Sequence, residues 1–71
     1  MTVATRYRDA GRVYRETCEQ ARLVRAAARK EARALEDWQA RRAALRAAGM
    51  AWTVAVEEAW RVCREAMEVE G

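Results

Sequence analysis

The feature that most limits the fold of this chain is the absence of proline and the scarcity of glycine. Its 71 residues include no proline and three glycines, Gly11, Gly49 and Gly71. Ala, Arg, Glu and Leu dominate, and all four are good helix formers. The alternation of β-branched and aromatic residues that marks strands never lasts more than a few positions. The sequence therefore predicts an all-α fold in a single helical domain over residues 1–71.

Gly49 is the main candidate for a helix end. It follows a basic last turn, which is the usual position of a terminating glycine. Thr53 then has the side chain of an N-cap for the next helix. We therefore predict a long helix over about 3–47, a turn near 49–52 and a shorter helix over about 53–69. Together they would form an antiparallel hairpin.

A turn at Gly49 determines which side chains meet. Residues equally distant from the turn lie at the same level, so Trp60 is predicted to meet Trp38, and Cys63 to meet Leu35. The two cysteines lack CxxC spacing and are interpreted as small hydrophobic residues. The predicted hairpin core contains Leu35, Trp38, Leu45, Trp52, Val56, Trp60 and Cys63.

The two predicted helices differ in length, about 68 Å against about 28 Å. The short helix would leave the apolar stripe of residues 3–24 uncovered. Either the long helix breaks near Gly11 or between residues 25 and 37 and folds back, or another chain covers the stripe. The lack of a helix breaker between Gly11 and Gly49 favours another chain, with a homodimer as the first choice and a larger protein as the second. The predicted partner interface contains Tyr7, Ala10, Tyr14, Cys18, Ala21 and Val24.

The chain is basic, with a formal net charge of +3. An arginine stripe on the first helix could contact nucleic-acid phosphates. It could also be the solvated flank of a coiled coil, and the acids interspersed with it favour this second interpretation. No known nucleic-acid-binding motif is present. The stripe contains Arg8, Arg12, Arg15, Arg22, Arg29 and Arg33.

Catalytic chemistry has few candidate residues here. The sequence has no His and no Ser, and it lacks a glycine-rich phosphate loop. We therefore expect no enzyme activity, no metal and no cofactor. The longest uncharged run covers only residues 47–56, which is too short to span a bilayer. We expect a cytoplasmic location without membrane contact. The favoured function is a small interaction protein of the phage or bacterial accessory type. It would act by oligomerisation or as an adaptor, inhibitor or assembly factor on a larger protein. The alternative is a nucleic-acid-binding helical dimer.

Overall fold

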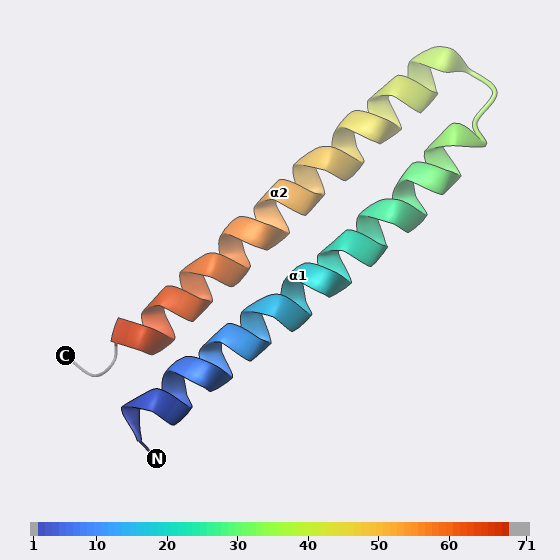
Figure 1. Cartoon of the computed structure of the whole chain (residues 1–71). Coiled ribbons are helices and arrows are strands. Elements are labelled where there is room, and N and C mark those ends of the chain that lie inside the picture. The colour runs from blue at the N-terminus through green and yellow to red at the C-terminus, as the bar shows by residue number, and fades with distance from the viewer. Residues whose placement is uncertain (1, 69–71) are drawn as a thin grey trace.

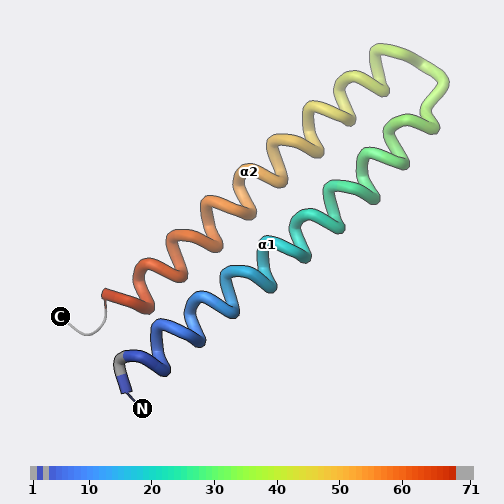
Figure 2. Tube along the Cα trace, viewed as in Figure 1, coloured from blue at the N-terminus to red at the C-terminus, as the bar shows by residue number. Residues whose placement is uncertain are grey.

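The computed structural model describes residues 2–68, and they form a hairpin of two helices. Helix α1 covers Val3–Arg33 and helix α2 covers Trp38–Glu68. The helices run antiparallel and side by side, so that the start of α1 and the end of α2 lie at the end opposite the turn (Figures 1 and 2). The predicted all-α hairpin is confirmed. The predicted end of the second helix at residue 69 lies outside the described residues.

The position of the turn was predicted wrongly. It lies at residues 34–37, and the two helices have 31 residues each. The carboxylate of Asp37 caps α2 by accepting hydrogen bonds from the backbone N–H groups of Gln39 and Ala40 at 3.4 and 3.2 Å. The guanidinium of Arg41 donates to the carbonyl oxygen of Leu35 at 3.1 and 2.9 Å. These bonds satisfy backbone groups that the helix ends leave without partners.

Gly49 lies inside α2 and does not end a helix. A glycine in a helix interior costs about 1 kcal/mol relative to alanine. A turn at Gly49 would instead leave some twenty residues of α1 without a packing partner, whereas the turn at 34–37 lets the helices cover each other along their full length (Figure 1). The larger apolar burial outweighs the single glycine. Thr53 is likewise inside α2, where its hydroxyl donates to the carbonyl oxygen of Gly49 at 3.1 Å.

The hairpin is elongated and has a single layer. Its Cα radius of gyration is 16.4 Å, against about 11 Å for a globular chain of this length. Its Cα extents are 54 × 17 × 8 Å. A single layer leaves two broad sides of the helix pair uncovered, whereas most domains bury such sides against a second layer.

Replacing Gly49 with Ala tests the position of the turn. A Cβ atom at Gly49 meets no atom within 4 Å, so we expect Gly49→Ala to raise the free energy of unfolding by about 1 kcal/mol. Gly11→Ala is the control, because Gly11 lies inside α1 and a Cβ there would make only an ordinary contact, 3.4 Å from a guanidinium nitrogen of Arg15, so it should gain a similar amount. Urea denaturation followed by circular dichroism measures both. A loss of stability in Gly49→Ala would indicate a turn at that residue.

Candidate functional site

Small side chains fill the seam between the two helices. The buried apolar residues are Ala10, Ala32, Ala48, Ala59 and Cys63, and none of the described large side chains is fully buried. Along α1, half-buried residues recur at intervals of three and four, as in a coiled coil: Tyr14, Cys18, Ala21, Arg25 and Ala28. The core is therefore thin, and most large apolar side chains of the hairpin remain in contact with solvent.

Most residues of the predicted partner interface are covered within the hairpin itself. Helix α2 is long enough to reach this part of α1, so Ala10 is buried, and Tyr14, Cys18 and Ala21 are half-buried, within the hairpin itself. The premise that α2 is too short to cover them was wrong. Two predicted interface residues stay exposed: Tyr7 is nearly half exposed, and Val24 retains 65% of its accessible surface.

The predicted contact between Trp38 and Trp60 is not formed. Trp60 instead packs edge-to-face on Tyr14, with ring centroids 5.6 Å apart and an interplanar angle of 71°. Trp38 begins α2 at the turn end of the hairpin and is 61% exposed. Leu35 lies in the turn and is also exposed. The rest of the predicted core lies in or beside the seam: Leu45, Trp52 and Val56 are half-buried, and Cys63 is buried.

Tyr14 belongs to a small cluster near the middle of the seam, toward the end where α1 begins. A hydrogen bond with the Cys18 thiol raises the pKa of Tyr14 above its ordinary value, and loss of solvent contact adds to the shift. Both Cys18 and Cys63 are free thiols. The cluster therefore has a structural role, since it joins the half-buried part of α1 to Trp60 of α2.

One broad side of the hairpin carries an apolar groove. The groove has a volume of about 440 Å³. Helices α1 and α2 contribute six lining residues each, and three of the twelve are charged: Arg6, Asp9 and Glu58. We call it the valine groove; its lining includes Val13, Thr17, Ala55, Glu58, Ala59, Val62 and Ala66. Val13 and Val62 are each nearly half exposed. An open apolar groove of this kind is the usual form of a docking surface.

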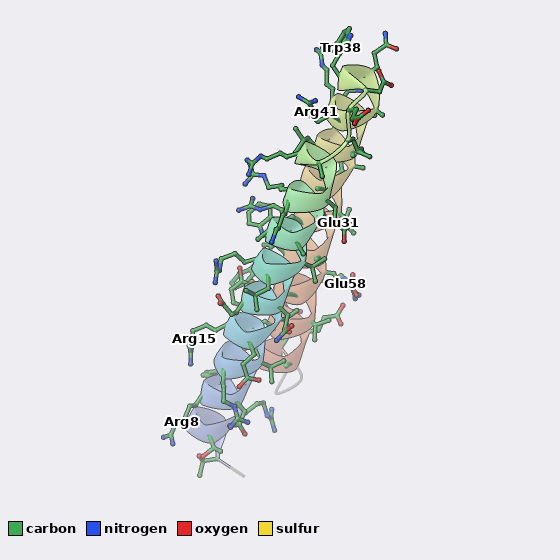
Figure 3. The ribbon with its side chains drawn as sticks, turned by 90° about the vertical axis from the view of Figure 1, so that its right-hand side faces the viewer. Arg8, Arg15, Glu31, Trp38, Arg41 and Glu58 are labelled. Carbon is green, nitrogen blue, oxygen red and sulfur yellow. The ribbon has the colours of Figure 1, made fainter. Side chains whose placement is uncertain are left out.

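The opposite side of the hairpin carries arginines and aromatic rings. Figure 3 shows Arg8 and Arg15 on one side of the helix pair and Glu31 and Glu58 on the other. On the basic side, the guanidinium of Arg25 lies 4.4 Å from the ring centre of Trp52, a cation–π geometry. Three shallow hollows that share residues run along this side. We call the arginines and tryptophans that line them the arginine track: Arg15, Arg22, Arg25, Trp38, Arg42, Arg46 and Trp52.

The predicted arginine stripe is only partly free of acidic partners. Arg12 pairs with Asp9 at 3.8 Å, and Arg22 pairs with Glu19 at 2.6 Å, which lowers the pKa of Glu19. In α2, Arg61 pairs with Glu58 and Glu65. No ion pair involves the following described arginines: Arg8, Arg15, Arg25, Arg29, Arg33, Arg42 and Arg46. The sequence did not place Arg42 and Arg46 beside this stripe, because only the turn at 34–37 brings them there.

Neither of the described helix spans is long and apolar enough to cross a lipid bilayer. Within residues 2–68, no three His, Cys, Asp or Glu side chains gather as ligands of a metal ion would.

Comparisons with known proteins give no indication of function, so the valine groove and the arginine track are the features from which a function can be inferred. No family model, no curated protein and no solved structure matches this chain.

A double-mutant cycle tests the ring contact. Tyr14→Ala and Trp60→Ala should each destabilise the hairpin, and their effects should be coupled by about 0.5–1.5 kcal/mol, because the rings touch. Trp38→Ala combined with Trp60→Ala is the control. These two residues lie about 33 Å apart along α2, so their effects should add. Urea denaturation of the single and double variants measures both cycles, and coupling in the control pair would contradict the turn at 34–37.

Proposed function

We propose that this chain is a non-enzymatic interaction protein that acts as a dimer of helical hairpins. In the dimer, the sides of the two hairpins that carry the valine grooves would face each other and form a four-helix bundle. The absence of His and Ser supports a non-catalytic role. The free thiols of Cys18 and Cys63 are consistent with a reducing compartment, and a cytoplasmic location stays a prediction.

The exposed area is the observation that carries the proposal. The structure has a solvent-accessible surface of 5589 Å². A globular monomer of its mass, 8.1 kDa, exposes about 4,500 Å². The excess of about 1,100 Å² compares with about 800 Å² per partner in a stable protein–protein interface. One hairpin therefore exposes about as much additional surface as a stable dimer would cover.

The register of the helices favours a second copy as the partner. In an antiparallel dimer with full overlap, the two-fold axis passes near Cys18, the midpoint of α1. Val24 lies six residues to one side of Cys18, and Val13 lies five residues to the other. The exposed Val24 of one copy would thus lie over the valine groove of its partner. Val24 faces this side because it follows the groove residue Thr17 by two helical turns.

The distribution of charge favours the same orientation. The turn half of the hairpin, residues 23–48, carries seven basic and three acidic residues. The open half, residues 3–22 and 49–68, carries seven of each. An antiparallel dimer places each basic turn half beside the neutral open half of its partner, whereas a parallel dimer would bring two positive ends together.

Replacing Val24 with Glu tests the dimer. Val24→Glu would place an unpaired charge inside the interface, and we expect dimer affinity to fall on the order of a hundredfold while the hairpin stays helical. Leu23→Glu is the matched control, because Leu23 is its neighbour, is 47% exposed and points away from the groove. Sedimentation velocity across micromolar concentrations measures the mass, and circular dichroism checks the fold.

Two results would argue against this dimer. One is a wild-type chain that sediments as an 8.1 kDa monomer at high micromolar concentration, which would favour a larger protein as the partner of the valine groove. The other is equal dissociation in Leu23→Glu and Val24→Glu, which would place the interface on another side of the hairpin.

A further inference from the structure

The arginine track is continuous along the hairpin. The hollow at the turn end contains Trp38, Arg42 and Arg46, and the next hollow shares Arg46 with it. The third hollow shares Arg25 and Trp52 with the second and extends to Arg15 and Arg22. From the level of Arg15 to the turn, the track follows α1 for about 27 Å. A ligand that binds it must therefore be extended and must present repeated negative charge.

The guanidinium groups of the track are largely available to such a ligand. Arg15, Arg42 and Arg46 form no ion pair with the described residues, and Arg25 is held against the ring of Trp52. Only Arg22 has an acidic partner, Glu19, and both side chains are more than half exposed. Guanidinium groups match the geometry of phosphate oxygens better than ammonium groups do. The track therefore suits a chain of phosphates.

An aromatic ring extends this recognition beyond charge. Trp38 is 61% exposed, and it shares its hollow with two unpaired arginines, Arg42 and Arg46. Exposed aromatic rings beside arginines are the surfaces on which unpaired bases stack. We propose that the arginine track binds single-stranded nucleic acid, with its arginines on the phosphates and Trp38 stacked on a base.

The arrangement of the two surfaces favours nucleic acid over a lipid surface. A helix that lies on a membrane carries its basic residues beside an apolar face. Here the valine groove lies on the side of Glu58, opposite Arg15 (Figure 3), so a membrane could not contact both. The track also remains open when the groove-bearing sides of two hairpins face each other. Binding at the track therefore does not depend on the proposed dimer.

A binding titration with two double variants tests the contribution of the arginines. The probe is a fluorescent 20-mer of deoxythymidine, and fluorescence anisotropy reports binding across a series of salt concentrations. Loss of two phosphate contacts in Arg42→Gln/Arg46→Gln should flatten the salt slope by about 1.4 and weaken binding about 25-fold at 0.1 M salt. The matched control is Arg12→Gln/Arg61→Gln, which removes the same charge from two arginines already paired with acids. It should bind nearly as tightly as the wild type.

A second pair of variants tests the stacking. Trp38→Ala should weaken binding by about 5- to 150-fold, and Trp38→Phe should retain most of the affinity, because a ring that can stack is preserved. With Trp52 and Trp60 changed to Phe, Trp38 is the sole tryptophan of the chain. Its fluorescence should then be quenched when the 20-mer binds.

Several results would overturn the proposal. The first is no binding of the 20-mer at low salt, and the second is equal weakening by the two double arginine variants. A duplex bound as tightly as the single strand, with no effect of Trp38→Ala, would exclude the stacking. Tighter binding to phosphatidylserine vesicles than to the 20-mer would assign the track to a membrane surface.

Discussion

The small size of alanine at the helix–helix contacts determines how closely the two helices pack and how little apolar surface they bury. Side chains as small as those of Ala10, Ala32, Ala48 and Ala59 let two helices pack closely along 31 residues each. They also contribute little apolar area, so the pair forms without enclosing any of the described large side chains. The larger residues lie on the flanks of the seam, so the two sides of the hairpin differ. One side is apolar around Val13 and Val62, and the other is basic and aromatic around Arg25 and Trp52.

The helical class could be predicted from composition, because no strand pattern competes with the helix formers. The antiparallel pairing followed from expecting one turn between two helices, although that turn was placed at the wrong residue. The position of the turn could not be predicted, because its signals are weak. Asp37 is an ordinary N-cap, but the turn residues Ala34 and Leu35 look like helix interior. Arg41 closes the turn through the carbonyl oxygen of Leu35, a contact that exists only after the chain has folded. Gly49 was the stronger local signal for a turn. The additional apolar surface that two helices of equal length bury outweighs that local preference.

The misplaced turn also explains which parts of the candidate surfaces could be predicted. The stripe containing Tyr14 and Cys18 was recognised from its spacing, but the residues opposite it depended on the register. The single stripe of basic residues on α1 was likewise visible in the sequence. The arginine track needs Arg42, Arg46 and Trp52 of α2 beside that stripe, which a turn near Gly49 places elsewhere. Sequence periodicity thus identified the faces of single helices. A surface built by two helices could be predicted only if the alignment of one helix against the other was also known.

The turn has a consequence for the order in which the hairpin forms. Contacts next to residues 34–37 close short loops and lose little chain entropy, whereas contacts between the two chain ends close loops of nearly sixty residues. Helix pairing is therefore easiest to begin at the turn and to extend toward the termini. By the same reasoning, local opening starts at the far end. The ring contact of Tyr14 with Trp60 lies between the midpoint of the hairpin and that end, so it would limit how far such an opening spreads.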